Sequence, residues 1–156
     1  MSKSLKRVEA EAKALGLSIE IIRETELTTT AQMAADARQC TVDQIVKSIL
    51  FRVEDSDEHV LFLTAGGNRV DPEKAAACSA RLLTRADATS IRAYTGFAIG
   101  GVSPLGHLNP VPKFFDQRLL DFTTIWAAAG TPNHVFEIDP NLLLAKTGAT
   151  LADFTI

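Results

Sequence analysis

The sequence predicts an α/β fold of the α+β kind, in which a mixed sheet is flanked by helices. Some segments carry apolar residues at helical spacing, whereas others are short runs of β-branched and aromatic residues. Two of the strand-like runs are separated only by an acidic turn, which indicates a hairpin. The chain has 156 residues and shows no linker, repeat or low-complexity run. We therefore expect a single domain over residues 1–156, since domains cluster near ~100–150 residues.

The N-terminal part is expected to form two helices and one strand. The helix over 5–15 carries its apolar residues on one face and ends at Gly16. Residues 18–23 are expected to form a strand. Thr30 is a typical N-cap, whose hydroxyl accepts a backbone N–H, and it begins a helix over 31–38.

The hairpin consists of strands over 46–53 and 59–64, joined by the acidic turn at 54–58. A strand alternates its side chains between two faces. One face of the first strand should therefore carry Lys47, Ile49, Phe51 and Val53. His59, which follows the acidic turn, is expected to be solvated.

The remaining elements are predicted from their caps or their composition. They are a one-turn segment with a capping box at Thr41 and Gln44, a helix over 72–78 begun by Asp71, a helix begun by Asp87 and ending before Gly96, a loop with short extended pieces over 96–112, strands over 113–115, 124–128 and 134–138, and a helix begun by Asp139 and closed by Gly148.

Composition and charge restrict the function classes. The chain has 16 basic and 19 acidic residues and a net charge of −3, so it lacks the general basic field with which many proteins bind nucleic acid. This charge balance does not exclude local contacts with nucleic acid. Cys40 and Cys78 are too few for a disulfide framework, and no run approaches the ~18 apolar residues of a membrane span. The N-terminal segment is expected to be a helix and not a secretion signal, and the protein is expected to be cytoplasmic.

The segment over 96–107 is the most informative part of the sequence because it holds four glycines and a proline. Glycine allows a positive φ and lets a ligand approach the backbone closely. Free N–H groups in such a loop can bind an anion, or a carbonyl oxygen that gains negative charge during acyl transfer. The spacing matches neither a P-loop nor a dinucleotide fingerprint. A structural turn between two strands remains the alternative.

Lys47 is the second informative residue, because it lies within an apolar strand between Val46 and Ile49. In a partly buried site its pKa would be lowered, and it could act as a base or polarise a carbonyl. The alternative is a lysine that extends from the sheet edge into solvent. Periodicity alone does not decide which face of the strand is buried.

Three blocks of sequence, in this order, resemble the YbaK/prolyl-tRNA-editing family, also called the insertion-domain (INS) superfamily, which includes freestanding ProX-like proteins. The blocks are IVKSILF at 45–51, GNRVD at 67–71 and GFAIGGVSPLGH at 96–107. The similarity continues through GTPNH at 130–134 and DPNLL at 139–143. The resemblance implies a largely antiparallel, curved sheet flanked by helices.

The resemblance also implies an activity. Family members are aminoacyl-tRNA deacylases, which hydrolyse the ester that joins a wrong amino acid to tRNA, most often tRNA(Pro). The expected function is therefore trans-editing of tRNA(Pro) that carries a small non-cognate amino acid such as Ala, Ser or Cys. The expected partners are the aminoacyl-tRNA acceptor end and, as a further candidate, prolyl-tRNA synthetase. The family works without metal or nucleotide cofactor, so none is expected here.

The family's site residues can be carried over one by one. The key active-site lysine matches Lys47, and the G-x-x-x-P loop matches Gly100 to Pro104, whose backbone amides are thought to position the aminoacyl carbonyl. The attacking water is thought to be assisted by a ribose hydroxyl of the terminal adenosine. The catalytic candidates are thus Lys47, Gly100 and Gly101. The substrate-binding candidates are Ser48, Met33, Phe97, Val102, Ser103, Pro104, Gly106, His107 and His134, with Ala34 as a further pocket wall.

Several of these assignments have plain structural alternatives. His134 is either a pocket residue or a strand-end imidazole, and His107 either covers the site, meets an RNA phosphate or lies on a surface loop. Arg69 either binds RNA phosphate as a fork of donors or forms a salt bridge with an acid such as Asp71. Trp126 is expected in the core rather than as a platform for bases.

A metal site is not expected, because no two histidines or cysteines have the spacing of a known motif. Cys40 and Cys78 lie among alanines and are expected to be small core fillers, so a thiol hydrolase is disfavoured. The alternative from another class is a non-catalytic module that binds an aminoacyl-tRNA end, a free amino acid or a nucleotide. The complete glycine loop together with Lys47 favours the enzyme.

Overall fold

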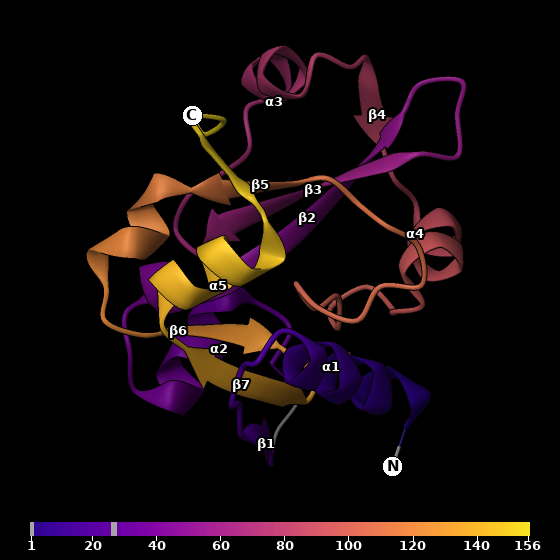
Figure 1. Cartoon of the computed structure of the whole chain (residues 1–156). Helices are drawn as coiled ribbons and strands as arrows, with labels where there is room; N and C mark the ends of the chain where they lie inside the picture. The colour runs from indigo at the N-terminus through magenta and orange to yellow at the C-terminus, as the bar shows by residue number, and fades with distance from the viewer. Residues whose placement is uncertain (1, 26–27) are drawn as a thin grey trace.

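The computed structural model describes residues 2–25 and 28–156 and confirms the predicted mixture of helices and sheet (Figure 1). The elements in chain order are α1 (Lys3–Ala14), β1 (Ile21–Arg23), α2 (Ala31–Arg38), η1 (Val42–Gln44), β2 (Val46–Val53), β3 (His59–Ala65), α3 (Pro72–Ser79), β4 (Leu83–Arg85), α4 (Ala88–Thr95), β5 (Lys113–Asp116), η2 (Gln117–Asp121), β6 (Ile125–Ala128), β7 (His134–Ile138), α5 (Pro140–Thr147) and β8 (Thr150–Ala152).

The helices begin where the sequence places their caps. Thr30, Asp71, Asp87 and Asp139 each accept a backbone N–H from the first turn of the helix that follows. Such a bond satisfies one of the four N–H groups that a helix start leaves unpaired. Gly148 ends α5 with a positive φ of 67°, a conformation that costs glycine little. The capping box of Thr41 and Gln44 is also present and begins η1.

The strands form two sheets. One has the order β4-β2-β3-β5-β8, and the other has the order β1-β7-β6. The hairpin β2–β3 is antiparallel, as predicted, whereas β5 pairs in parallel with β3 and with β8. A parallel bridge between Ile45 and Trp126 connects the start of β2 to β6 of the other sheet. The two sheets therefore meet beside the strand that carries Lys47.

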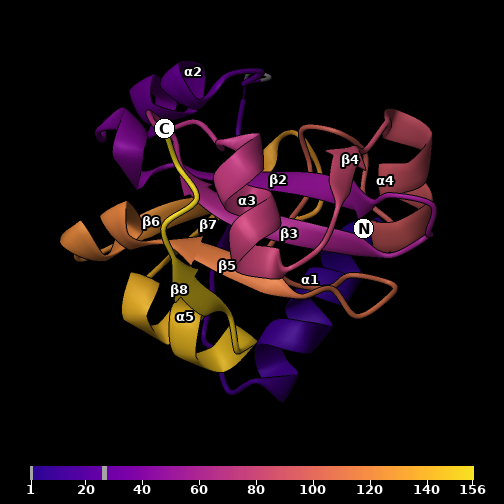
Figure 2. The same ribbon diagram turned by 90° about the horizontal axis from the view of Figure 1, so that it is seen from above.

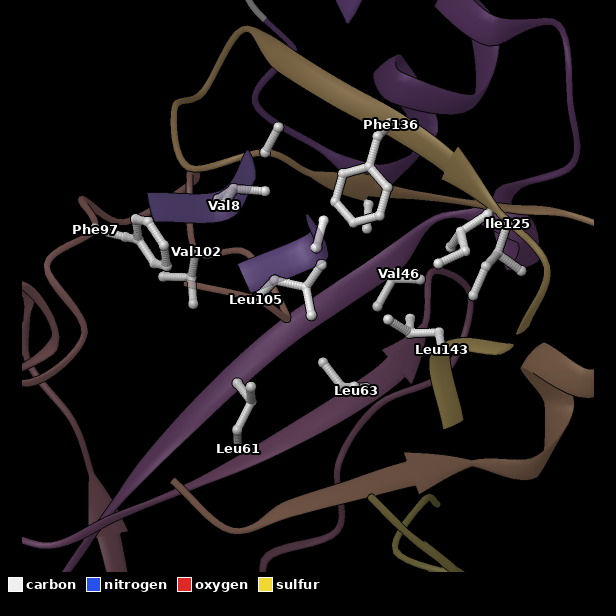
Figure 3. Close-up of a cluster of buried hydrophobic side chains, with 14 of the residues drawn as sticks. Val8, Val46, Leu61, Leu63, Phe97, Val102, Leu105, Ile125, Phe136 and Leu143 are labelled. Carbon is white, nitrogen blue, oxygen red and sulfur yellow. The ribbon is translucent and has the colours of Figure 1, made fainter. Parts of the chain in front are cut away.

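The hairpin β2–β3 divides the apolar interior into two clusters. Its face with Val46, Leu50 and Leu63 packs against the second sheet, α1, α5 and the glycine-rich segment. Figure 3 shows this cluster, with Leu61 and Leu63 lying opposite Phe136 and with Phe97, Val102 and Leu105 at one side. The other face packs against α3 and Phe154, and Figure 2 shows α3 lying over these two strands.

The structure departs from the sequence prediction in several places. The first strand covers only 21–23, the segment 96–112 forms no strand before β5, and the three-residue strands β4 and β8 and the helix η2 were not predicted. A three-residue strand has too few positions to show alternation, so only its pairing partner defines it.

The expectation that His59 is solvated is wrong. Its side chain is buried because its ring stacks on Tyr94 of α4, with ring centroids 4.4 Å apart, and its Nδ1 lies 2.8 Å from the Asp57 carbonyl oxygen. Over the described residues, no helix is long and apolar enough to cross a membrane.

Candidate functional site

Lys47 is held near the start of β2 by a backbone carbonyl. Its ammonium donates a hydrogen bond to the Asn68 carbonyl oxygen, with Nζ and O 2.5 Å apart. It shares its face of the strand with Ile49 and Phe51, as the alternation predicted, and it lies opposite Thr64 of β3. The side chain is only partly buried, so its charged end can reach a ligand.

A buried carboxylate holds the residue that binds Lys47. Asp116, at the end of β5, is buried, and its Oδ2 accepts the Asn68 side-chain amide at 2.9 Å and the Ala65 N–H at 3.0 Å. Its Oδ1 accepts the Arg118 N–H at 3.0 Å. A buried carboxylate needs such donors, since burying a charge without partners is costly. Asn68 is therefore held by two hydrogen bonds, one from its carbonyl to Lys47 and one from its side-chain amide to Asp116.

A second carboxylate fixes the adjacent glycine turn. Asp43 of η1 accepts the Gly67 N–H at 2.8 Å and the Arg118 Nε at 2.9 Å. A Cβ on Gly67 would lie 2.3 Å from the Asp43 Oδ1, so any larger residue would displace this carboxylate. The turn that carries Asn68 is thus held both by η1 and by β5.

The pKa of Lys47 is lowered from its ordinary value. Burial is the main cause and the nearby Arg69 guanidinium is the second, whereas Asp116 and Asp43 act in the opposite direction. Both carboxylates thus favour the charged form of Lys47, which burial disfavours. The lysine is suited to holding an anionic or carbonyl oxygen as a point charge.

The glycine-rich segment over 96–107 packs directly against the turn between β6 and β7. Gly100 has a φ of 87°. A Cβ on Gly101 would lie 2.9 Å from the Cα and carbonyl carbon of Thr131, so this glycine is needed for the close approach of two backbones. The segment is therefore built into the core and is more than a surface turn.

Some backbone amides of this segment donate hydrogen bonds to acceptors within the segment itself, and others do not. The Gly101 N–H donates to the Ala98 carbonyl oxygen at 2.9 Å, and the Leu105 N–H donates to the Ser103 hydroxyl at 3.2 Å. The amides of Gly100, Val102 and Ser103 donate to no acceptor within residues 2–25 and 28–156. Val102 and Ser103 are themselves buried. Unpaired amides in such a loop are suited to an oxygen of a ligand, and Gly100 is the exposed member of the three.

Phe97, His107 and Gly106 maintain the shape of the segment. Phe97 is fully buried and meets the His107 ring edge to face, with ring centroids 5.7 Å apart. The His107 Nε2 donates to the Ser103 carbonyl oxygen at 2.6 Å, because a carbonyl can only accept. Burial, and then Lys113, lowers the pKa of His107 to about 4, so its ring is neutral near pH 7.

Ser48, the neighbour of Lys47, lies on the opposite face of β2. It alternates with Val46 and Leu50, which share a cluster with Val102 of the glycine-rich segment. Its Oγ is buried and has no hydrogen-bond partner in the described part of the chain. The strand therefore directs Ser48 towards the side of the glycine-rich segment and Lys47 towards the Asn68 turn.

His134 is half-buried at the start of β7, in the turn that touches the glycine-rich segment. Its Nδ1 lies 2.5 Å from the Thr131 Oγ1, and that hydroxyl lies 3.0 Å from the Asn133 Oδ1. Since the Asn133 oxygen can only accept, Thr131 donates to it and His134 donates from Nδ1. In the neutral tautomer that fits these bonds, the other ring nitrogen, Nε2, is an acceptor.

The remaining candidates lie at the surface. Met33 on α2 is 44% exposed, and Ala34 beside it is half-buried. Arg69 is exposed, and it forms no salt bridge with Asp71 or with any other acid among the described residues. Trp126 is half-buried beneath the Arg38 guanidinium, which lies 5.2 Å from its ring centroid.

The cysteines and the acidic residues do not point to other chemistry. Burial is the main cause that raises the pKa of both Cys40 and Cys78, so their thiols stay protonated and weakly nucleophilic. Within the described ranges, no group of three or more His, Cys, Asp or Glu side chains is arranged to hold a metal ion.

Two surface cavities of about 380 and 370 Å³ lie away from this region. One is formed around Leu142 of α5 and Glu137 of β7, and the other around His59 and Tyr94. Neither is lined by Lys47 or by the glycine-rich segment. A substrate at Lys47 would therefore lie outside both of these cavities.

Sequence reasoning missed the residues that support Lys47. Asn68 lies in the GNRVD block but was not singled out, and no local pattern joins it to Asp116, which is 48 positions away. Thr131, which orients His134, was likewise not recognised. A polar residue at the end of an apolar strand, as at Asp116, is the one hint that the sequence offers.

The family model of the aminoacyl-tRNA editing domain matches residues 25–145. The uncharacterized protein YwhH of Bacillus subtilis (strain 168) is 31% identical over 117 residues, which cover 73% of this chain and 72% of that protein.

Solved structures show the same fold over the whole chain. A crystal structure provisionally described as a trans-editing enzyme for prolyl tRNA synthetase is 40% identical, with a TM-score of 0.92, and covers 100% of this chain and 99% of that one. The hypothetical protein APE2540 has a TM-score of 0.88 at 24% identity, covers 96% of this chain and 99% of that one, and shows the shared fold alone.

Proposed function

This chain belongs to the aminoacyl-tRNA editing domain family, and we propose that it acts as a freestanding deacylase of misacylated tRNA. The relative described as a trans-editing enzyme for prolyl tRNA synthetase favours tRNA(Pro) as the tRNA. The favoured substrates carry a small non-cognate amino acid such as Ala, Ser or Cys. A proline-sized site cannot exclude small amino acids well, because one methylene changes binding by only ~1–3 kcal/mol. A cytoplasmic location is part of this proposal, because it is the location expected of a protein that edits aminoacyl-tRNA.

The observation that carries the proposal is a set of three backbone amides, at Gly100, Val102 and Ser103, that donate to no acceptor in the part of the chain that the structure describes. Attack of water on an ester carbon forms a C–O bond and moves negative charge onto the carbonyl oxygen. Fixed N–H donors stabilise that charge, and loss of one such donor in a hydrolase costs ~10²–10³ in rate. The bond to the ribose oxygen then breaks, and that oxygen takes a proton while the free amino acid leaves.

Lys47 supplies charge in this proposal and is not a covalent nucleophile. Its Nζ is anchored on the Asn68 carbonyl and keeps further N–H donors, since an ammonium has three. These donors would hold a phosphate or carbonyl oxygen at the acceptor end of the tRNA. Arg69, exposed beside them and without a salt bridge to any acid in the described part of the chain, would bind a further phosphate.

The substrate's amino acid would lie between β2 and the turn over 130–134. Ser48 and His134 are the proposed polar contacts, with Met33 at the surface as an apolar wall. Val102, Ser103 and Pro104 would line the other side through the loop backbone. Phe97, Gly106 and His107 are proposed to act by maintaining the shape of that loop.

The decisive experiment is a deacylation assay over a panel of tRNA(Pro) charged with Ala, Ser, Cys or Pro, with and without excess EDTA. We expect turnover of at least one small non-cognate ester, unaffected by EDTA, and little turnover of the prolyl ester. The Lys47→Ala variant should lose at least about 100-fold in kcat/KM. Lys6→Ala, which removes an exposed lysine of α1, is the matched control.

The alternative function is a non-catalytic module that binds an aminoacyl-tRNA end, a free amino acid or a nucleotide. The absence of turnover across the whole panel, together with measurable binding of tRNA, would favour that module. Adding prolyl-tRNA synthetase to the same assay tests whether the synthetase is a partner, since a partner should raise kcat/KM.

A further inference from the structure

Arg7 of α1 binds both ends of the glycine-rich segment. Its Nη2 donates to the Gly96 carbonyl oxygen at 2.7 Å, and its Nε donates to the Gly106 carbonyl oxygen at 3.1 Å. The same guanidinium lies over the ring of the buried Phe97, 5.1 Å from its centroid. One side chain therefore joins two backbone positions that lie ten residues apart in the sequence.

Glu11, one helical turn further along α1, completes the contact. Its Oε2 accepts the Gly106 N–H at 2.5 Å, so Gly106 is bound through both its N–H and its carbonyl. The i, i+4 spacing places Arg7 and Glu11 on the same face of the helix. Arg7 thus donates to the carbonyl oxygens of Gly96 and Gly106, and Glu11 accepts the N–H of Gly106.

The packing of α1 against the glycine-rich segment leaves no room for a side chain at Gly96 or at Gly106. A Cβ on Gly96 would lie 2.8 Å from the Leu108 Cγ and still closer to the Arg7 guanidinium. A Cβ on Gly106 would lie 2.8 Å from the carbonyl carbon of Arg7 and from the Val8 nitrogen. Both glycines also have positive φ values, 83° and 84°. The segment is therefore shaped to accept α1.

The apolar face of α1 packs into the same cluster as the segment. Val8 is fully buried, and Figure 3 shows it near Phe97 and Val102. Gly130, in the turn that contacts Gly101, also touches α1, since a Cβ there would lie 3.0 Å from the Ser4 carbonyl oxygen. The residues of α1 lie outside the range 25–145 that the family model covers.

We propose that α1 acts as a clamp in which Arg7 and Glu11 are positioning residues for the amides at Gly100, Val102 and Ser103. The proposal rests on the proposed deacylation, in which those amides stabilise the carbonyl oxygen. Fixing the segment at 96 and at 106 limits how the intervening backbone can rotate. A misplacement of about 1 Å can cost about 100-fold in rate, so a clamp remote from the ester can control the chemistry.

The first test measures kcat and KM separately in three variants and one control. Arg7→Lys keeps the charge, but its single nitrogen cannot hold both carbonyls in the same geometry, so kcat should fall about 10-fold to 100-fold with KM little changed. Glu11→Met removes the acceptor and should act in the same direction. Glu11→Gln keeps an acceptor oxygen for the Gly106 N–H and should restore kcat to within about threefold of the wild-type value. Lys13→Ala, on the exposed side of α1, is the control.

The second test does not depend on activity. Amide hydrogen exchange of Gly106, followed by NMR, should become at least about tenfold faster in Glu11→Met and stay near wild type in Glu11→Gln. If the wild-type protein deacylates no ester of the panel, the proposed function fails, whereas the exchange result still tests the clamp. Wild-type kcat in Arg7→Lys and Glu11→Met, or unchanged Gly106 exchange in Glu11→Met, would overturn the clamp.

Discussion

Lys47 and Asp116 are linked through one residue, Asn68. The Asn68 carbonyl oxygen accepts the Lys47 ammonium at 2.5 Å, and its side-chain amide donates to the buried Asp116 carboxylate at 2.9 Å. Asp116 therefore acts on Lys47 both through its charge and through the position of Asn68. A lysine on a sheet edge would have neither constraint, and this distinguishes Lys47 from an ordinary surface lysine.

Asp116→Asn tests this linkage. The variant removes a charge that raises the pKa of Lys47, so that pKa should fall further below its ordinary value. It also places an amide nitrogen where a carboxylate accepts two or more N–H groups, which should lower the free energy of unfolding by about 1–3 kcal/mol. NMR titration of Lys47 and urea unfolding measure the two effects.

The matched control for this variant is Asp121→Asn. Asp121 is an exposed carboxylate that pairs with Arg118 and does not contact Asn68. An exposed pair contributes less than about 1 kcal/mol, so the control should leave stability and the Lys47 titration almost unchanged. An unshifted Lys47 pKa in Asp116→Asn would show that Asp116 does not govern the lysine.

Gly101→Ala should reduce deacylation more than its effect on backbone conformation alone would suggest. The new Cβ would meet the Thr131 backbone at 2.9 Å, and a backbone cannot move aside as a flexible side chain can. The displaced amides should lower kcat by about 100-fold or more. Single-turnover deacylation at saturating enzyme isolates this chemical step.

Gly148→Ala provides the comparison for Gly101→Ala. Gly148 has a φ of 67°, but a Cβ there would meet nothing within 4 Å, and it lies at the end of α5. The Gly148→Ala substitution should lower the free energy of unfolding by about 1 kcal/mol and leave kcat unchanged. Equal kcat values in the two variants would contradict a role of the Gly101 backbone in the reaction.

The contrast between local and long-range features explains what the sequence could predict. Helix starts at Thr30, Asp71 and Asp139 depend on bonds within one turn, and all three were predicted. The strands over 46–53 and 134–138 were predicted because their apolar patterns are long enough to show alternation. The pairing of β4 with β2, and of β8 with β5, depends on residues distant in sequence and could not be derived from three positions each.

The same contrast applies to the candidate site. Lys47 and the Gly100–Pro104 loop were singled out because their residue types are unusual in their setting. The bonds that orient them join positions 21 to 99 residues apart, as between Lys47 and Asn68, Asn68 and Asp116, and Arg7 and Gly106. No periodicity or motif encodes such a distance, and only the folded backbone brings these groups together. The roles of the individual site residues stay predictions until the variants are measured.

Ser48→Ala should separate a substrate contact from a structural one. The Ser48 Oγ is buried and has no partner in the described part of the chain, so its removal should leave the free energy of unfolding unchanged or slightly higher. If the hydroxyl bonds to the substrate, kcat/KM should fall about tenfold or more, since a lost hydrogen bond to a charged group is worth ~1.5–3 kcal/mol.

The control for Ser48→Ala is Ser79→Ala. Ser79 is at the end of α3, and its hydroxyl donates to the Ala76 carbonyl oxygen. This change should leave kcat/KM unchanged for every ester of the panel. A Ser48→Ala variant with wild-type kcat/KM on all of them would remove Ser48 from the substrate site.

The pH dependence of stability should report on His107. Burial lowers its pKa to about 4 in the folded protein, against 6.5 for an ordinary histidine. Between these two values the unfolded chain binds a proton that the folded protein does not, so the free energy of unfolding must fall as pH falls. This difference corresponds to roughly 3 kcal/mol, which is fully present above pH 6.5 and lost by about pH 4.

Urea unfolding between pH 7.5 and pH 4 measures this contribution when the wild type is compared with His107→Asn. The asparagine amide can still donate to the Ser103 carbonyl oxygen, but it has no group that titrates in this range. Carboxylates and the buried His59 titrate in both proteins, so their contributions cancel in the difference. The difference in unfolding free energy should therefore shrink as pH falls, because the wild type alone loses the His107 contribution. A constant difference across the range would mean that His107 titrates normally and that the glycine-rich segment does not bury its ring.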